Sequence, residues 1–324
     1  MNDSSVSLKA VAITGPTSGL GRAMALELSS PDRLLILVGR NHAQLEALKQ
    51  NIESKGGQAA VVSCDLADLR SVRRAAVEIQ SAARGHAFVG LINNAGVQQR
   101  VLTKTAEGVD LSFAVNHLGP FVLTESLLPA LRPGSTVIFL GSGTEDPQEA
   151  NATRFGFRGA RYISAEDSAA GRWLPGGSRV PGQDAYATSK LCNILSARAL
   201  ASENSTIRFA ALDPGLVPGT GLARDVTGPL QWVWRYLLPL VARILPGWSS
   251  PGRVGRVVDQ ILKDASFASG TYFDYSGRPQ RGSTMASDPR LAARMVAETR
   301  QLLARLSSRN ADRALNTSRT GQDR

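Results

Sequence analysis

Ala10-Val-Ala-Ile-Thr-Gly-Pro-Thr-Ser-Gly-Leu-Gly21 is the stretch that decides the fold. Its first five residues form an apolar run that is too short for a helix and is ended by Gly15 and Pro16, which predicts a buried strand. A helical pattern begins at Arg22. A strand, a glycine loop and a helix in this order favour a phosphate site, because backbone N–H groups and the helix N-terminus can approach a pyrophosphate. Glycine also makes ordinary turns, so the loop alone is a weak signal.

Strand-like and helix-like segments alternate after this loop. Three further strands are predicted at 34–38, 58–63 and 88–92, with helices at 42–55 and 71–83 between them. Such alternation implies right-handed crossovers and a parallel sheet. We therefore expect an α/β fold in which one Rossmann-type, doubly wound parallel sheet carries helices on both faces, as a single domain over residues 1–310.

The composition excludes several classes of protein. The chain has 324 residues, 43% of them hydrophobic, which is enough to bury a full core. Cys64 and Cys192 cannot form a disulfide framework, and we predict that both are buried apolar residues. No His/Cys/Asp grouping has metal-ligand spacing, so we predict no metal site.

Charge and hydropathy bear on partners and location. The net charge of +10 comes mostly from scattered arginines without a nucleic-acid motif, which favours a solvated surface and leaves room for a positive patch that binds a phosphorylated cofactor. The N-terminus has no secretion signal, and no run of 18 uncharged apolar residues occurs. We therefore expect a cytoplasmic protein with no transmembrane span and no nucleic-acid partner.

The end of the second predicted strand indicates which cofactor is used. An acid there would hold the ribose 2′-hydroxyl of NAD, whereas an arginine accommodates the 2′-phosphate of NADP. The strand ends in Val38-Gly-Arg40 with no acid, and Arg22 lies just past the glycine loop. Two arginines near the expected ribose favour NADP(H), although both side chains would also suit an ordinary solvated surface.

Tyr186-Ala-Thr-Ser-Lys190 opens another predicted helix. Residues four apart share a helix face, so the phenol and the ammonium would lie side by side. The pKa of a free tyrosine is about 10, and a neighbouring cation lowers it. The pair can therefore act as an acid/base unit, although many helices carry Tyr and Lys at this spacing by chance.

Taken together, these segments resemble the short-chain dehydrogenase/reductase family. The motifs occur in the family's order over roughly residues 10–275: Thr14-Gly15 through Gly21, Cys64-Asp65-Leu66, Asn93-Asn-Ala-Gly96, Val115-Asn-His-Leu-Gly119, Val137-Ile-Phe-Leu-Gly-Ser142, Tyr186 to Lys190, and Asp213-Pro-Gly215. The segments 186–195, 213–222 and Ser269-Gly-Thr-Tyr272 are similar to the branch of protochlorophyllide reductases and retinol-dehydrogenase-like enzymes. The protochlorophyllide enzymes place a cysteine directly after the Pro-Gly, where this chain has Leu216.

The resemblance implies four catalytic residues. Tyr186 would be the general acid/base, and Lys190 would lower its pKa and hold the ribose hydroxyls of the nicotinamide half. Ser142 would hydrogen-bond the substrate oxygen, and Asn116 would position a water that links Lys190 to solvent. Without the other motifs, Ser142 would pass for a loop serine and Asn116 for a polar residue in a helix.

The resemblance also implies where the cofactor NADP(H) binds. The expected contacts are Gly15, Thr17, Ser18, Gly19, Leu20, Gly21, Arg22, Arg40, Asp65, Leu66, Asn93, Ala95, Gly96, Tyr186, Lys190, Pro214, Gly215 and Val217. Asp65 and Asn93 would lie beside the adenine and its ribose. The Pro-Gly segment and Val217 would line the nicotinamide.

Two segments are expected to set the substrate. Residues 143–184 form an insert that is longer than the usual family connection, and we expect a long loop at the pocket rim. Residues 216–250 carry Trp232, Trp234, Tyr236 and Trp248, and in this family that segment is a lid over the substrate. These aromatic residues would also suit packing onto the core or contact with a membrane surface. The lid interpretation ranks first and implies a bulky apolar substrate.

These observations predict an NADP-dependent oxidoreductase that interconverts a carbonyl and an alcohol on a bulky apolar small molecule. The alternatives are a protochlorophyllide-reductase-like reduction of a ring double bond and a non-catalytic NADP(H)-sensing module. We expect a monomer or homo-oligomer, with weak membrane-surface contact as an open alternative. A helix is predicted near the C-terminus at 288–306, followed by a disordered tail at 311–324.

Overall fold

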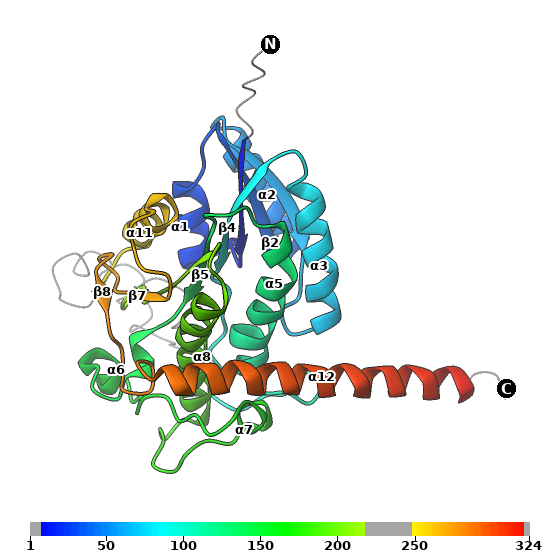
Figure 1. Ribbon diagram of the computed structural model, residues 1–324, viewed down its shortest axis with the longest axis vertical. Helices are drawn as coiled ribbons and strands as arrows, with labels where there is room; N and C mark the ends of the chain where they lie inside the picture. Colours follow the sequence, from blue (N-terminus) through cyan, green and yellow to red (C-terminus); the bar gives the residue numbers. More distant parts are fainter. Residues whose placement is uncertain (1–7, 218–247, 321–324) are drawn as a thin grey trace, which may run out of the picture.

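The computed structural model describes residues 8–217 and 248–320, with side chains described up to residue 308 (Figure 1). Eight strands form one sheet in the order β3-β2-β1-β4-β5-β6-β7-β8. The strands are β1 (Lys9–Thr14), β2 (Arg33–Gly39), β3 (Gln58–Ser63), β4 (Ala87–Asn93), β5 (Thr136–Leu140), β6 (Arg208–Leu212), β7 (Thr271–Phe273) and β8 (Pro279–Gln280). All neighbours are parallel except β8, which runs antiparallel to β7. The predicted α/β fold with a parallel sheet is confirmed.

Helices connect the strands and cover the sheet. They are α1 (Gly19–Glu27), α2 (His42–Glu53), α3 (Leu69–Ala82), α4 (Leu111–Phe113), α5 (Gly119–Leu127), α6 (Ala150–Arg154), α7 (Ala165–Ala170), α8 (Pro181–Glu203), α11 (Pro251–Lys263) and α12 (Pro289–Thr320). Single turns lie at η1 (Ala114–Leu118), η2 (Leu128–Ala130) and η3 (Gly143–Glu145).

The alternation of side chains along each strand builds a core on both faces of the sheet. In β1, Ala10 and Ala12 join the core under α3, α5, α8 and α12, whereas Val11 and Ile13 join the core under α1, α2 and α11. Figure 1 shows α1 beside α11 and, on the other side of the sheet, α3, α5 and α8. Because both faces are covered, the strands read as continuous apolar runs.

The strand order reverses beside β1, which has β2 on one side and β4 on the other. In open α/β sheets, ligands bind outside the carboxyl ends of the strands at such a switch point. The loops after β1, β2, β3 and β4 are therefore the expected position of a ligand.

The insert at 143–184 differs from the expected long loop. It contains η3, α6, α7 and the first turn of α8. Glu149 and Ser164 cap α6 and α7, and the aromatic side chains of Phe157 and Tyr162 are buried. Tertiary burial of these two rings supplies the free energy that orders a segment rich in polar residues.

The C-terminal part also differs from expectation. α12 continues to Thr320, so the predicted disordered tail at 311–324 is helical as far as residue 320. Six of the twelve residues from 309 to 320 are Ala, Leu or Arg, which have high helix propensity, and each added residue extends a helix that is already nucleated. Residues 218–247 of the predicted lid, with Trp232, Trp234 and Tyr236, lie outside the described residues. Within the described ranges, no helix is long and apolar enough to cross a membrane.

Candidate active site

The predicted site residues gather at one edge of the sheet. Gly15 to Gly21 follow β1, Arg40 follows β2, Asp65 and Leu66 follow β3, and Asn93 to Gly96 end and follow β4. Ser142 follows β5, and the Pro214-Gly215 pair follows β6. Since these strands are neighbours in the order β3-β2-β1-β4-β5-β6, their carboxyl ends form one continuous rim.

The glycine loop is a tightly packed turn. Gly15 and Gly19 have φ values of +65° and +51°, in the left-handed region that favours glycine. A Cβ atom on Gly21 would collide with the carbonyl oxygen of Gly15, so a side chain there would push α1 away from the loop. Ser18, the N-cap of α1, makes no side-chain capping bond, which leaves the first N–H groups of the helix to a ligand.

Two residues that the sequence analysis did not select connect this loop to β4. Asn94 donates from Nδ2 to the carbonyls of Thr14 at 2.8 Å and Gly15 at 3.2 Å. The Thr14 hydroxyl accepts from the backbone N–H groups of Asn94 and Ala95, both at 3.0 Å. The sequence signal for this contact was the second asparagine of Asn93-Asn94, because a side-chain amide at the end of a strand can donate hydrogen bonds to the carbonyl groups of a neighbouring loop.

The expected adenosine side of the rim carries unpaired polar groups. Arg22 and Arg40 are exposed, and within the described part of the chain neither makes an ion pair. Asn93 is 1% exposed and donates to Thr124, but its Oδ1 has no hydrogen-bond partner. A buried acceptor without a partner is costly, so this atom fits a position that a ligand or water completes.

Asn116 holds the loop after β4 in place. It lies in the π-helical turn η1, a local widening that is frequent at functional sites. Its Oδ1 accepts from the N–H of Val97 at 2.7 Å, and its Nδ2 donates to the Val97 carbonyl and to Ser189 Oγ, both at 2.9 Å. Asn116 is therefore a positioning residue in this structure, and its link to Lys190 through water stays a prediction.

Ser142 and Tyr186 meet at the end of β5. Ser142 caps η3 by accepting from the N–H of Thr144 at 3.3 Å, and the Thr144 hydroxyl donates to it at 3.1 Å. The Ser142 hydroxyl also lies near enough to the phenol of Tyr186 to lower its pKa. The ring of Tyr186 is 8% exposed and lies 6.2 Å, between centroids, from Phe157 of the insert. The insert therefore forms one wall beside the phenol.

Lys190 lies one helical turn beyond Tyr186, as the spacing predicted. Its Nζ donates to the carbonyl of Leu140 at 3.0 Å and lies 5.5 Å from the centroid of the Tyr186 ring. A Cβ atom on Gly96 would lie 3.4 Å from this Nζ and 3.3 Å from Asn116 Oδ1. The loop after β4 thus runs directly over Lys190 and Asn116, where only glycine fits comfortably.

The pKa of Tyr186 differs from the expectation that Lys190 would lower it. Burial raises the pKa of Tyr186, the Asp213 carboxylate raises it further, and the hydrogen bond from Ser142 lowers it. The predicted lowering by Lys190 does not prevail, because burial has the largest effect on the phenol; the ammonium itself donates to Leu140. Burial also lowers the pKa of Lys190 to about 8, against a smaller rise caused by Asp213. Near neutral pH the tyrosine is therefore a neutral phenol and the lysine is mostly a charged ammonium.

Asp213 is the third ionisable group of the site, and the sequence analysis gave it no role. Its carboxylate accepts from the N–H of Gly215 at 2.9 Å and from the backbone of Gly143. Burial raises its pKa to about 6. The sequence signal for Asp213 was an acid directly before a Pro-Gly pair at the end of a strand, because that position lies on the same rim as Ser142.

The rim fits a nicotinamide dinucleotide. The open N-terminus of α1 suits a pyrophosphate, and Lys190 and the phenol lie beyond it past the switch point. Val217 is buried and Pro214 and Gly215 are half-buried, at the position predicted to line the nicotinamide. Within the described ranges, no group of three or more His, Cys, Asp or Glu residues could hold a metal ion, and Cys64 and Cys192 are buried and free.

Comparisons with known proteins agree with this arrangement. The family model of short chain dehydrogenases matches residues 9–154. Protochlorophyllide reductase A of Oryza sativa subsp. japonica is 30% identical over 311 residues, covering 88% of this chain and 78% of the relative. Retinol dehydrogenase 14 of Mus musculus is 35% identical over 239 residues, covering 68% of this chain and 65% of the relative.

Solved structures share the fold. An uncharacterized protein from Mycobacterium paratuberculosis superposes with a TM-score of 0.60 at 29% identity, covering 91% of this chain and 93% of the other. The angucycline C-6 ketoreductase LanV, solved with bound NADP, superposes with a TM-score of 0.62 at 22% identity and covers 83% and 94% of the two chains. At that identity, the second match supports the fold alone.

The role of Asn116 as an anchor can be tested through stability. Replacement by alanine leaves the N–H and carbonyl of Val97 without partners, and we expect the free energy of unfolding to fall by about 3 kcal/mol in urea denaturation. The control Asn204→Ala removes one hydrogen bond to Leu200 at a half-exposed helix end and should cost at most about 1 kcal/mol. Equal losses in the two variants would contradict the anchoring role.

Proposed function

This chain belongs to the short-chain dehydrogenase/reductase family of oxidoreductases, and we propose that it interconverts a carbonyl and an alcohol on a bulky apolar substrate with NADP(H). The observation that carries the proposal is the convergence at the end of β5. There, the Ser142 hydroxyl reaches the Tyr186 phenol, and Lys190 lies one turn further along the same helix. These are the donors that a reaction developing negative charge on oxygen requires.

The protein's own groups handle the substrate oxygen and its proton. When bound, the nicotinamide of NADP(H) supplies or accepts the hydride. In the reductive direction, Tyr186 Oη gives its proton to the substrate oxygen while Ser142 Oγ donates a hydrogen bond to the same atom. In the oxidative direction, the Tyr186 phenolate takes the proton back. Both groups are already in place because Ser142 is fixed by its cap on η3.

Lys190 supports this proton exchange. The phenolate form of Tyr186 is disfavoured by burial, so it needs a cation nearby, and Lys190 is the buried cation on the same helix face. Its ammonium would also hold the ribose hydroxyls of the cofactor. Because the pKa of Tyr186 is raised, the phenol is protonated near neutral pH, as a proton donor to the substrate oxygen must be.

NADP(H) is proposed over NAD(H) because of the rim after β1 and β2. Arg22 and Arg40 are exposed and free of ion pairs within the described residues, so both guanidinium groups are available to a 2′-phosphate. LanV, which shares the fold, was solved with NADP, and the carbonyl reductase from chicken fatty liver was solved with NADPH.

A large apolar substrate is proposed from the surroundings of Tyr186 and from the relatives. Ala152 and Phe157 of the insert form an apolar cluster with the Tyr186 ring, which provides a hydrophobic wall at the reacting oxygen. The names of the relatives refer to protochlorophyllide and retinol, both large apolar molecules. The lid expected at 216–250 would cover such a substrate, and most of it lies outside the described residues.

Reduction of a ring double bond is the second candidate, because several relatives are protochlorophyllide reductases. The residue after Pro214-Gly215 argues against it, since Leu216 stands where those enzymes carry cysteine. Light-dependent conversion of protochlorophyllide by the purified protein would establish this candidate. Tight NADPH binding without turnover of any ketone or aldehyde would instead support a sensor.

Tyr186→Phe tests the acid/base assignment directly. The variant removes only the phenolic oxygen, so NADPH should still bind, while kcat for carbonyl reduction should fall by about a hundredfold to ten-thousandfold. Tyr275→Phe is the control and should keep its turnover, because it removes a phenolic oxygen from the loop after β7 and leaves the ring that packs against Arg253. Unchanged turnover in Tyr186→Phe would contradict the assignment.

The pKa of Lys190 predicts how cofactor affinity varies with pH. This pKa is lowered to about 8, so the ammonium is present below that pH and is lost as pH rises through it. We expect the Kd of NADPH to increase about tenfold between pH 7 and pH 9.5, measured by cofactor fluorescence, because a charge-assisted hydrogen bond disappears. Lys190→Met should bind weakly at both pH values with no such slope. An identical slope in that variant would assign the titration to another group.

Arg22→Ala and Arg40→Ala test the choice of cofactor. Each should raise the Kd of NADPH about tenfold and leave the Kd of NADH unchanged, because NADH has no 2′-phosphate. Arg84→Ala removes the same charge from an exposed position after α3, at the opposite edge of the sheet, and should change neither value. Equal losses for NADH and NADPH would show that the two arginines do not read the 2′-phosphate.

A further inference from the structure

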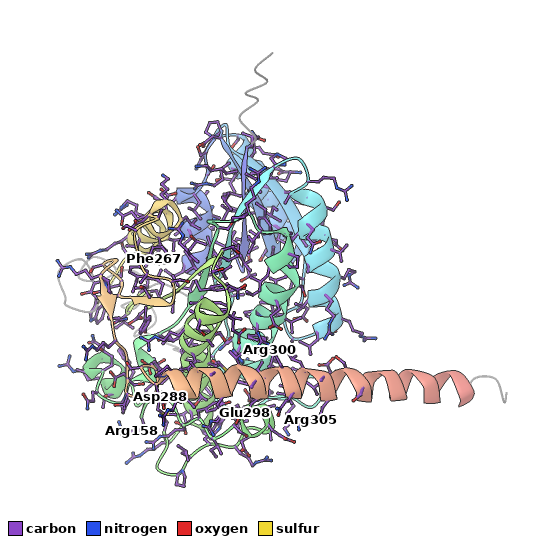
Figure 2. All side chains as sticks on the ribbon, in the orientation of Figure 1. Arg158, Phe267, Asp288, Glu298, Arg300 and Arg305 are labelled. Atoms are coloured by element: carbon purple, nitrogen blue, oxygen red, sulfur yellow. The ribbon has the colours of Figure 1, made fainter. Side chains whose placement is uncertain are left out.

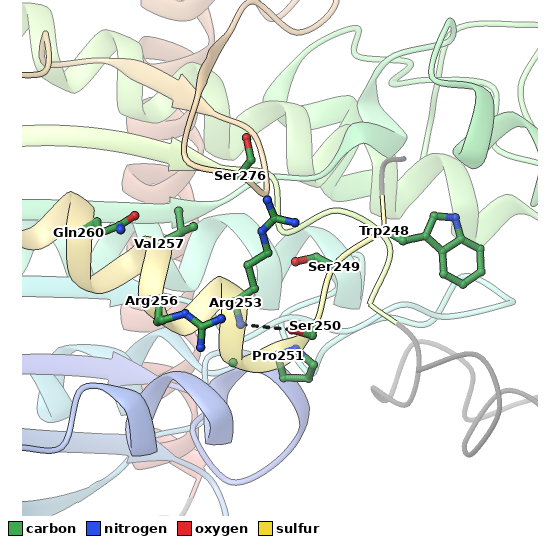
Figure 3. Close-up of a pocket in the computed structure, with 10 residues that line it drawn as sticks. Trp248, Ser249, Ser250, Pro251, Arg253, Arg256, Val257, Gln260 and Ser276 are labelled. Atoms are coloured by element: carbon green, nitrogen blue, oxygen red, sulfur yellow. Dashed lines mark hydrogen bonds between the residues drawn. The ribbon is translucent and has the colours of Figure 1, made fainter. Parts of the chain in front are cut away.

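A polar cavity lies at the N-terminus of α11, the helix that packs against α1 (Figure 3). Its volume is about 800 Å³, and its lining includes Trp248, Ser249, Ser250, Gly252, Arg253 and Arg256. Trp248, Ser249 and Ser250 end the segment expected to be the substrate lid, but none of the lining residues takes part in the hydride or proton transfer proposed above. Their chemistry is that of an anion site, and three independent features support this.

The first feature is a buried hydroxyl without a partner. Ser249 is 2% exposed, and its Oγ makes no hydrogen bond. The residue is held rigidly, because its N–H donates to the Leu216 carbonyl at 2.9 Å, beside the bridge between Leu216 and Trp248. Figure 3 shows the hydroxyl on the side that faces the Arg253 guanidinium. An unsatisfied buried donor is costly, so its orientation into a cavity indicates a missing acceptor.

The second feature is uncompensated positive charge. Arg253 and Arg256 make no ion pair within the described part of the chain, and the Arg253 guanidinium is held 5.4 Å from the centroid of the Tyr275 ring. Two of the nearby acids are engaged elsewhere, and Glu27 of α1, whose side chain lies against Gly255, makes no ion pair with either arginine within the described residues. Asp259 pairs with Arg33 at 3.0 Å and with Lys263 at 2.5 Å, and Asp274 Oδ1 accepts from the backbone and hydroxyl of Ser276, both at 2.7 Å.

The third feature is the helix itself. α11 has 13 residues, and its N-terminus opens on the cavity. The first N–H groups of a helix lack intrahelical acceptors, and the aligned peptide dipoles place partial positive charge there. Pro251 at the first position has no N–H, and the Ser250 hydroxyl accepts from the Arg253 N–H at 3.4 Å, so the backbone of Gly252 and the two arginine side chains are the remaining donors at this end.

We propose that Ser249, Arg253, Arg256 and the first turn of α11 form an oxyanion site that takes a carboxylate or a phosphate group. The site is one strand spacing from Leu216, which follows the segment proposed to line the nicotinamide. The anion is therefore either a group carried by the substrate or a free anion that binds next to the reaction centre. The site itself does not depend on the proposed carbonyl chemistry.

Titration of the full-length protein, saturated with NADPH so that the phosphate sites of the cofactor are filled, with inorganic phosphate tests the site by calorimetry. We expect the Arg253→Ala/Arg256→Ala double variant to weaken phosphate binding by at least about tenfold and Ser249→Ala to weaken it by a few-fold. Arg84→Ala controls for the loss of charge and should bind phosphate like the unmodified protein. Unfolding temperatures without phosphate, measured for every variant, confirm that each is folded.

Two results would overturn the proposal. One is a phosphate affinity in the double variant equal to that of the unmodified protein. The other is a parallel loss of NADPH affinity in the double variant, which would make the cavity part of the cofactor site. An unchanged Kd for NADPH together with lost phosphate binding supports a separate site.

A second measurement identifies the source of the anion and rests on the proposed function. KM is compared for acetophenone and 4-acetylbenzoate, which differ by one carboxylate. A lower KM for the carboxylate compound that disappears in the double variant assigns the site to the substrate. Equal KM values, with phosphate binding intact, assign it to a free anion. Absence of turnover with either ketone would count against the carbonyl reaction and leave the phosphate result standing.

Discussion

The carbonyl oxygen of Leu140 accepts hydrogen bonds from Lys190 Nζ and Asn193 Nδ2, both at 3.0 Å, and this contact fastens α8 to the end of β5. Ser142 lies two residues beyond that carbonyl, and Tyr186 lies one turn before the lysine. The distance between hydroxyl and phenol is therefore set by the junction of one strand and one helix. Rigid elements hold catalytic groups more accurately than loops do, which is why this junction determines the rest of the site.

Burial sets the charge states around that junction. It raises the pKa of Tyr186, lowers that of Lys190 to about 8 and raises that of Asp213 to about 6. Each shift favours the neutral form, as desolvation does for both acids and bases. Asp213 partly opposes the shift of Lys190, so the carboxylate keeps the lysine more cationic than burial alone would. Three groups with shifted pKa values, Tyr186, Lys190 and Asp213, therefore lie within one turn of α8 and the end of β6.

Local patterns predicted much of this architecture. The apolar runs became strands β1 to β4, the glycine loop became the turn before α1, and the Tyr186–Lys190 spacing became one face of α8. These features depend on neighbours in the sequence. The helices of the insert were missed because they depend on burial of Phe157 and Tyr162 against distant elements. The upward pKa shift of Tyr186 was missed for the same reason, since the spacing of residues in a sequence does not show how deeply a side chain is buried. Asn94 and Asp213 were missed because their contacts form only when the ends of the strands come together in the fold.

The contact between the insert and α12 has a consequence for protein engineering. Glu298 Oε2 accepts from the Tyr162 hydroxyl at 2.5 Å and from the N–H of Ala165 at 3.1 Å, so the C-terminal helix, on which Figure 2 labels Glu298, supports the insert that packs beside the Tyr186 phenol. The insert and α12, which are more than a hundred positions apart along the chain, therefore depend on each other structurally. A chimaera that borrows the rim of another enzyme has to borrow its terminal helix too, and a shortened version that ends before Glu298 would lose the support of its own pocket wall.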